Sequence, residues 1–392
     1  MWFAGFPTLF KSRKWAQTIS PTSDENRYPR LSMWPNAALA ERATETLCSR
    51  LGVNNIARQE RPEEWFEYAN ARFDACGNLR RAVAGKIDYF WQPVMGRFGN
   101  NFQQIVHAIA LAEIEGVAQI YHGLGWLPLR LRISDGIVLL RGKPSFLSFR
   151  AGLRVGAFSR WRLPGLQGLG AEDVARICQT LLAPAMQWIE EPAEKNAITV
   201  YFRAGDVTKL QPNRNRTFVQ PPAAFYTRAI ETIAAKTGRD QLKLVYADRS
   251  NPAIKQVEDW ALHTGFTVIA NGNADFDEDV RSMLAAEHLI VGHSSFSDAL
   301  AQLSRNLKSF SFFRAAHNIS ALHFRAVKLF HGVDVDQKYI PHGTWSNSNA
   351  QRELIVNYPQ QSIVITDFSD NDADAVSAYD RGNLKNGLPP LS

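Results

Sequence analysis

Residues 197–206, with the sequence Ala-Ile-Thr-Val-Tyr-Phe-Arg-Ala-Gly-Asp, predict a buried strand that ends at a charged turn. The strand is apolar and contains β-branched residues, a pattern typical of the central strands of a parallel sheet. Arg203 and Asp206 stand at its carboxyl end, where the cost of removing a guanidinium and a carboxylate from water is usually tolerated at binding or reacting sites. A structural Arg–Asp pair at a strand end is the alternative, and the sequence leaves both open.

Helical and extended patterns alternate on the C-terminal side of this strand. Strands and helices at such spacing are typical of a doubly wound parallel sheet, so we expect a Rossmann-like lobe here. The expected elements are a polar loop at 211–220, helices at about 222–236, 252–264, 277–287 and from residue 294, and strands at 242–247, 267–270 and 288–291.

A second unit of the same kind precedes it. A strand at 87–91, a glycine turn at 96–99, a helix at 101–115 that ends at Gly116 and a strand at 117–121 predict a βαβ unit. The fold class is therefore α/β with two Rossmann-like lobes. We divide the chain into an N-terminal extension (1–80), a first lobe (81–190), a second lobe (191–335) and a C-terminal segment (336–392).

Composition places the chain among ordinary globular proteins. Its 392 residues, 45% hydrophobic and 21% charged, suffice for two domains with a ligand cleft between them. The widely spaced Cys48, Cys76 and Cys178 argue against a disulfide framework or a zinc site and favour a reducing compartment. No run of 18 apolar residues is present, so we expect a cytoplasmic protein, although the apolar start at 1–10 would suit a short anchor at the inner face of a membrane.

The positive charge of the chain is concentrated in one stretch. Residues 130–162 carry eight Lys or Arg and one acid, net +7, whereas the whole chain is +6, so the remainder sums to about −1. Phe146, Phe149, Phe158 and Trp161 lie among these charges, which suits an anionic polymer, a lipid phosphate surface or a nucleic acid. We disfavour nucleic acid because no motif for it is present, and ordinary solvated arginines remain an alternative.

Two further loops carry candidate binding residues at predicted strand ends. In the loop at 96–101, glycines allow close backbone approach while Arg97 and Asn100 offer hydrogen-bond donors, although a plain surface turn would look the same. In the loop at 293–297, serines begin a helix, where hydroxyls, backbone amides and the helix dipole attract an anion. Simple capping needs only one serine, so the run of serines favours a ligand.

The acidic residues at 275–279 satisfy the loose DxD pattern of metal-dependent sugar transfer. They follow a turn and precede a predicted helix, where acids complement the positive helix end, so we assign them to a helix start and expect no metal. No Walker sequence and no HExxH motif is present.

Taken together and in order, the three loops resemble the inverting fucosyltransferases related to the alpha-1,2-fucosyltransferase family. That family has a GRLGNQ-type loop that opens a helix, an HxRRGD-type strand end and a late NSTFS-type segment. The resemblance spans about 85–305, a little over half of the chain. The matching positions are 96–103, 201–206, the helix at 222–230, Asp248, Asp279, Met283 and 294–297.

The chain departs from the family pattern at four positions. Tyr201 replaces the usual His, Ala204 the second Arg, Arg249 the second Asp of an SDD element, and His293 the Asn before the serines. Because the second arginine is missing, the resemblance implies sugar transfer more strongly than it implies fucose.

The resemblance implies a GT-B architecture, with the acceptor mostly on the first lobe, a nucleotide-sugar such as GDP-fucose on the second, and no obligatory metal. The acceptor would be a glycan or lipid-linked glycan. Arg203 and the helix amides would meet the leaving diphosphate, Asp206 is the candidate base, and Arg97 and Asn100 would close across the cleft. The implied donor-binding residues are Arg97, Gly99, Asn100, Asp248, Ser294, Ser295, Phe296 and Ser297. A transferase with another donor, or an inactive glycan-binding relative, would share these loops.

Overall fold

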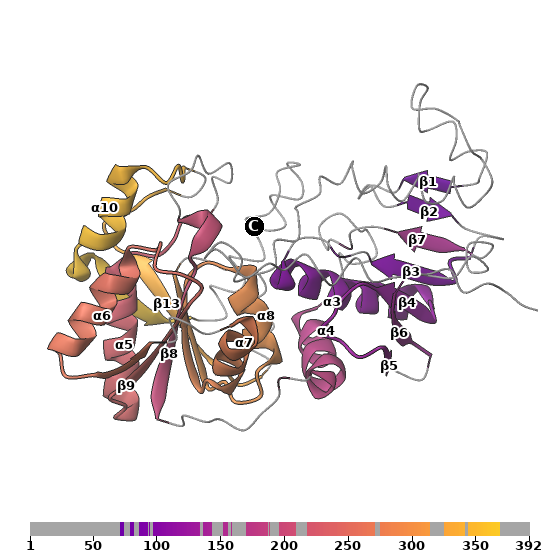
Figure 1. The fold of residues 1–392 in the computed structure, drawn as a ribbon, viewed down its shortest axis with the longest axis horizontal. Helices are drawn as coiled ribbons and strands as arrows, with labels where there is room; N and C mark the ends of the chain where they lie inside the picture. The colour runs from indigo at the N-terminus through magenta and orange to yellow at the C-terminus, as the bar shows by residue number, and fades with distance from the viewer. Residues whose placement is uncertain are drawn as a thin grey trace, which may run out of the picture.

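The structure is a computed structural model in which the described residues form two α/β lobes (Figure 1). Most of the N-terminal extension, the loop at 211–217 and the tail beyond 368 lie outside the described residues. Within the described part of the chain, no helix is both long and apolar enough to span a membrane. The residues described are 71–73, 79–81, 86–92, 94, 97–133, 136–142, 152–155, 158, 170–186, 188, 196–208, 218–270, 275–313, 325–341 and 344–368.

The first lobe is built on a seven-stranded sheet with the strand order β1-β2-β7-β3-β4-β6-β5. Its central strands run parallel and its outer pairs are antiparallel. Because β1 and β2 join this sheet, the first lobe begins before the predicted boundary at 81. The strands are β1 (Ala71–Phe73), β2 (Leu79–Arg81), β3 (Tyr89–Gln92), β4 (Gln119–His122), β5 (Arg130–Arg132), β6 (Val138–Arg141) and β7 (Leu153–Val155).

Helix α3 (Phe98–Glu115) connects β3 to β4, as the predicted βαβ unit requires. It begins three residues earlier than predicted, so that Gly99 lies within its first turn instead of in a loop. It ends at Gly116, whose left-handed backbone (φ 68°) is readily adopted by glycine. Helix α4 (Ala171–Arg176), continued by the π-helical turn η4 (Ile177–Leu182) and the 3-10 turn η5 (Ala183–Ala185), also belongs to this lobe.

The second lobe is built on another seven-stranded sheet, with the order β10-β9-β8-β11-β12-β13-β14. All strands are parallel except β14, which pairs antiparallel with β13, so the predicted boundary at 335 falls inside this lobe. Every residue of β8 is buried, as predicted for a central strand. The strands are β8 (Ala197–Phe202), β9 (Gln241–Tyr246), β10 (Thr267–Ala270), β11 (His288–Val291), β12 (Ser309–Phe313), β13 (Lys328–Asp334) and β14 (Ile363–Asp367).

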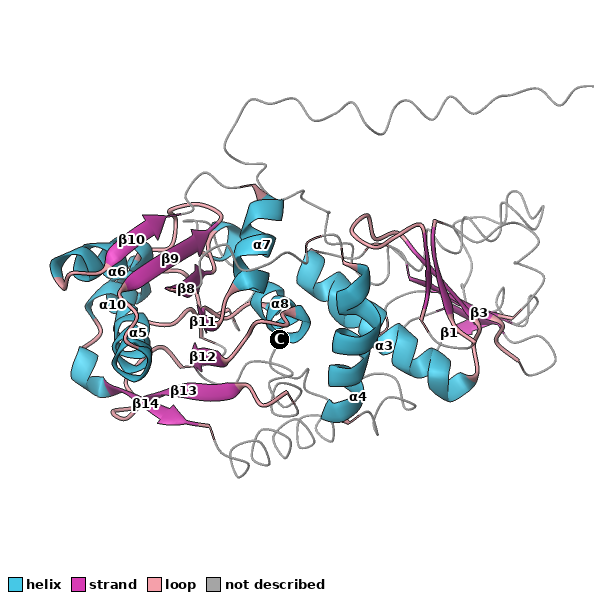
Figure 2. Cartoon of the chain, turned by 90° about the horizontal axis from the view of Figure 1, so that it is seen from below, coloured by secondary structure: helices cyan, strands magenta, loops and turns pink. Residues whose placement is uncertain are grey.

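Helices cover both faces of the second sheet (Figures 1 and 2). Those that follow β8 and β9 lie on one face, and those that flank β11 lie on the other, toward the first lobe. Two Rossmann-like lobes, the arrangement expected for a GT-B architecture, are therefore present. The helical segments are η6 (Gly205–Val207), α5 (Ala223–Thr237), α6 (Ala253–His263), α7 (Phe276–Ala285), α8 (Ser295–Leu303), α10 (Asn349–Asn357) and η7 (Gln360–Ser362).

The two lobes meet where α3 packs against α8 (Figure 1). One continuous apolar cluster runs through this contact, from Phe102 and Ile109 of α3 to Leu300 of α8 and Phe310 of β12. An apolar interface of this kind resists relative motion of domains. The lobes are therefore joined firmly along this edge.

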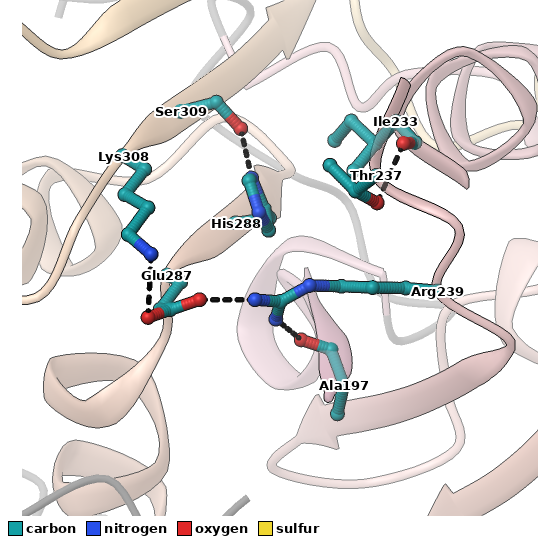
Figure 3. A network of polar contacts seen from close by, with 8 residues as sticks. All are labelled: Ala197, Ile233, Thr237, Arg239, Glu287, His288, Lys308 and Ser309. Carbon is teal, nitrogen blue, oxygen red and sulfur yellow. Dashed lines mark hydrogen bonds and ion pairs between the residues drawn. The ribbon is translucent and has the colours of Figure 1, made fainter. Parts of the chain in front are cut away.

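A polar network ties together the amino ends of the strands of the second sheet (Figure 3). Arg239, just before β9, donates to the carbonyl of Ala197 (3.0 Å) and pairs with Glu287. Glu287 also pairs with Lys308 (2.8 Å). Burial alone would raise the pKa of Glu287, but the bonds from Lys308 and Arg239 outweigh it and lower that pKa. The charged side chains at this edge of the sheet are thus paired with one another.

Candidate functional site

The opposite, carboxyl edge of the second sheet contains its topological switch point. From β8 the chain winds outward through β9 to β10, whereas from β11 it winds the other way through β12 to β13. Open α/β sheets bind ligands where the direction reverses, outside the carboxyl ends of the two strands. Here that place lies between β8 and β11, and it is bordered by Arg203 on one side and by residues 292–294 on the other.

A buried phenol lies at the centre of this place. Tyr201, the last but one residue of β8, is 4% exposed and lies within hydrogen-bonding reach of Ser294 and Arg203. Burial raises the pKa of Tyr201, and the charge of Arg203 opposes this shift without cancelling it. The phenol therefore keeps its proton at neutral pH and helps to hold Arg203, which is half-buried, beside the start of α8.

The charged turn after β8 is held in shape by the loop after β9. The Gly205 amide donates to the Asp248 carboxylate (3.3 Å) and to the Ser250 hydroxyl (2.9 Å). Gly205 has φ +76°, a conformation that other residues rarely adopt. The buried Asn251 side chain donates to the carbonyl of Arg203 (2.9 Å). Asp248 thus supports the turn, while Ser250 and Asn251 are supporting residues that the sequence patterns did not reveal.

The C-terminal segment adds a second layer of support. The indole of Trp345, which is 1% exposed, donates to the carbonyl of Val207 (3.2 Å). Arg352 of α10 donates to the carbonyls of Thr208 and Ser250 (3.1 Å for Ser250). These contacts join residues more than a hundred positions apart in sequence, which local patterns do not detect. The predicted C-terminal segment is therefore partly a brace for the site.

Each serine at the start of α8 has a structural partner. Ser294 caps the helix by accepting from the Phe296 amide (3.2 Å), and the Ser297 hydroxyl, which is fully buried, donates to the carbonyl of Ser294 (2.8 Å). The Ser295 hydroxyl donates to Asn100 of the first lobe (3.0 Å). The run of serines therefore does not by itself require a ligand, contrary to the interpretation from sequence. The positive end of the helix dipole remains at this place.

The predicted loop of the first lobe meets the predicted serine loop directly. A Cβ on Gly99 would lie 2.3 Å from the Ser295 carbonyl carbon and 2.6 Å from the Phe296 nitrogen, so only glycine fits. The rings of Phe98 and Phe296 are 5.7 Å apart. Gly99 and Phe296, expected to touch the donor, are instead buried in this joint.

The structure therefore sorts the predicted residues into three groups. Arg203, Ser294, Ser295 and Asn100 come together, with Asp248 behind them and the half-buried Arg97 just before α3. Gly99, Phe296 and Ser297 are buried packing residues. Asp206 lies in η6, but its side chain is outside the described part of the structure. Gly96 is outside the described part as well.

The acidic residues at 275–279 have structural roles. Asp275 caps α7 by accepting from the Glu278 amide (2.9 Å), which confirms their assignment to a helix start. Asp277 accepts from the indole of Trp188 (2.9 Å), and Asp279 is buried. Among the residues that the structure describes, no group of three His, Cys, Asp or Glu side chains is arranged to hold a metal ion. Metal independence remains a prediction.

The basic stretch divides between surface and interior. Arg130, Arg132 and Arg141 are exposed at the β5–β6 edge of the first sheet. Arg154 is 5% exposed and pairs with Glu115 (2.9 Å), and Phe158 is fully buried, so neither belongs to a basic surface as the sequence suggested. The other members, at 143–150 and 160–162, lie outside the described residues.

No protein-family model matches the chain, and no curated protein matches it. Similar solved structures include POFUT1 in complex with GDP, at 12% identity and a TM-score of 0.36, covering 57% of this chain and 97% of that one. The E. coli ADP-heptose LPS heptosyltransferase II has 10% identity and a TM-score of 0.35, covering 70% and 96%. The iron-containing dodecameric glycosyltransferase TibC from enterotoxigenic E. coli has 10% identity and a TM-score of 0.34, covering 77% and 79%. At these scores and identities the likeness carries no functional argument.

Proposed function

We propose that the chain is a glycosyltransferase that moves a sugar from a nucleotide-sugar donor to a glycan acceptor with inversion and without a metal. One observation supports this most directly. Arg203, the start of α8 and Asn100 of the first lobe converge at the switch point of the second sheet, with Ser295 bonded to Asn100 (3.0 Å). A donor held there would have its diphosphate on the second lobe and its sugar facing the first.

The chemistry of these groups suits a departing diphosphate. Arg203 offers a planar fork for phosphate oxygens, and the positive end of α8 stabilises charge that develops nearby. The protonated phenol of Tyr201 lies beside both. Fixed donors of this kind stabilise the transition state without reorganisation. Asp206 remains the proposed base for the acceptor hydroxyl because it follows Arg203 in the same turn.

The identity of the sugar is a finer part of the proposal. GDP-fucose is the first candidate because of the resemblance of the three loops, and another nucleotide-sugar is the alternative because Ala204 stands where the family has its second arginine. A lipid-linked glycan at a cytoplasmic membrane surface would suit the exposed arginines of the β5–β6 edge.

A thermal-shift panel of GDP, UDP and CMP tests the donor site. A nucleotide present at 100 times its Kd stabilises the folded state by about 2.7 kcal/mol and raises the melting temperature accordingly. We expect one diphosphate to do so and CMP not to. A chain that responds to no nucleoside diphosphate at saturating concentration would contradict the proposed function.

Hydrolysis of the nucleotide-sugar distinguishes an enzyme from an inactive glycan-binding relative. That second candidate is favoured by Tyr201, since its protonated phenol stands where the family has a histidine. A chain that binds the nucleotide but neither hydrolyses nor transfers the sugar, even slowly, would be the inactive relative. For the enzyme we expect activity to survive EDTA, whereas a complete loss that Mn²⁺ restores would contradict the metal-free assignment.

A further inference from the structure

One guanidinium of the C-terminal segment fastens two loops at the carboxyl edge of the second sheet. The half-buried Arg352 of α10 donates to the carbonyl of Thr208, directly after η6, and to the carbonyl of Ser250 (3.1 Å), in the loop after β9. Its remaining contact is with the side-chain oxygen of Asn347 (3.4 Å). Arg352 therefore links the charged turn that follows β8 to the neighbouring loop of the same edge.

The partners of Arg352 are all neutral oxygens, and two of them belong to the backbone. A planar guanidinium presents its donors in a rigid fork, so the two carbonyls are held in a set position relative to each other. Thr208 is only 1% exposed, so its carbonyl has little access to water as a substitute partner. The contacts of Arg352 thus fix the path of the backbone.

Other contacts hold the same part of the turn. The indole of Trp345, from the same C-terminal segment, donates to the carbonyl of Val207 (3.2 Å). The hydroxyls of Thr208 and Ser250 are hydrogen-bonded to each other (2.6 Å). The end of the turn, at 207–208, is therefore positioned by the C-terminal segment and by the loop after β9.

The beginning of the turn has different supports. The Asn251 side chain donates to the carbonyl of Arg203 (2.9 Å), and the phenol of Tyr201 lies within hydrogen-bonding reach of the Arg203 side chain. Neither contact involves α10. Loss of the Arg352 side chain should therefore displace the end of the turn while Arg203 keeps its place.

We propose that Arg352 is a positioning residue that places the proposed base Asp206 through the carbonyls of Thr208 and Ser250, an assignment that rests on the proposed function. Asp206 lies in η6, between the part of the turn held by Asn251 and the part held by Arg352. A displacement of about 1 Å in a reacting group is enough to lower a rate by about a hundredfold. The rate of the reaction, more than the affinity for the donor, should therefore depend on Arg352.

Kinetics and calorimetry of Arg352→Ala and Arg352→Lys test this assignment. The assay is hydrolysis of GDP-fucose, or of UDP-glucose if UDP is the nucleotide that binds, at a temperature where urea unfolding shows every variant to be folded. We expect Arg352→Ala to lower kcat by about tenfold to a hundredfold. The Kd of the nucleoside diphosphate and the KM of the nucleotide-sugar should change by less than about threefold, because Arg203 stays in place. Arg352→Lys keeps one donor and should show a smaller loss of kcat, and it carries the test if the alanine variant does not fold.

Tyr358→Phe is the matched control. Tyr358 follows the last residue of α10 and donates its hydroxyl to Asp334 of β13 (2.6 Å), so this change loosens the opposite end of the same helix. It should leave kcat within about twofold of wild type, since it does not touch the turn.

Three outcomes would overturn the assignment while the proposed function stands: wild-type kcat in both Arg352 variants, an equal loss of kcat in Tyr358→Phe, or weaker nucleotide binding in place of a lower kcat. A wild-type chain that binds no nucleoside diphosphate, or that turns over no nucleotide-sugar, would overturn both.

Discussion

The two edges of the second sheet differ in whether their buried polar groups have hydrogen-bond partners. At the amino edge, Arg239, Glu287 and Lys308 satisfy one another and the carbonyl of Ala197 (Figure 3). At the carboxyl edge, Gln220 Oε1 and the Tyr226 hydroxyl are buried without partners.

Paired charges at one edge contribute to stability, whereas unmatched groups at the other cost stability. Such a cost is commonly retained where a ligand supplies the missing partner. The comparison therefore assigns a structural role to the amino edge and supports the binding role that we propose for the carboxyl edge.

The largest contrast is expected between Arg203→Lys and Arg239→Lys. Lysine keeps the charge but loses the bidentate fork, so at the carboxyl edge turnover should fall by about tenfold to a thousandfold with little effect on folding. At the amino edge the same change breaks the contacts with Ala197 and Glu287, so it should lower the free energy of unfolding by about 1–2 kcal/mol and leave turnover intact. Steady-state kinetics and urea unfolding of both variants measure this contrast. Wild-type turnover in Arg203→Lys would remove Arg203 from the mechanism.

The joint between the lobes at the carboxyl edge is tested by Gly99→Ala. The added methyl would lie 2.3 Å from backbone of Ser295, which cannot move aside as a side chain can. We expect a loss of about 1–3 kcal/mol in unfolding free energy and weaker nucleotide binding, because α3 and α8 have to separate. Gly125→Ala, with nothing within 4 Å of its added methyl, is the control and should change stability by less than about 0.5 kcal/mol. Equal stability of the two variants would contradict the close contact.

Acid should destabilise the fold through its buried histidines. Burial, assisted by Arg141, lowers the pKa of His122 to about 4, and burial with Arg239 lowers that of His288 to about 4. Between pH of about 6.5 and 4 the unfolded chain binds protons that the folded chain does not, so stability is fully present above this window and is lost as pH falls through it.

His122→Asn isolates one of these two contributions. Asparagine can keep the acceptor for the Leu124 amide (3.2 Å) but does not titrate, so the pH dependence of urea unfolding should become shallower by on the order of 1–3 kcal/mol over the window. An unchanged slope would show that His122 does not contribute to it.

The smallest effect per residue is expected at the exposed arginines of the first lobe. Changing Arg130, Arg132 and Arg141 to Glu should weaken binding to phosphatidylserine vesicles by about 1 kcal/mol per residue and should raise the KM for a lipid-linked acceptor but not for the donor. The control changes three exposed cations of the second lobe, Arg228, Lys255 and Lys338, to Glu. Equal weakening by both triple variants would indicate a general charge effect and no dedicated surface.

Much of the fold could be predicted from the sequence because its signals are local. The apolar run at 197–202 became β8, Gly116 ended α3, and Asp275 began α7, each through interactions within a few residues. The sequence also identified the loops that hold Arg203 and Ser294, since a parallel α/β sheet brings its strand ends to one edge.

Only the tertiary structure decided what those loops contact. Gly99 looked like part of a binding loop, yet it is the point where α3 meets α8, and Arg154 looked like surface charge but is buried against Glu115. Gln220 and Tyr226 carried no motif, yet their side chains meet at Gly292, where only glycine leaves room for them. Such contacts join residues far apart in sequence, and they are set by how helices and sheets pack, which local periodicity does not record.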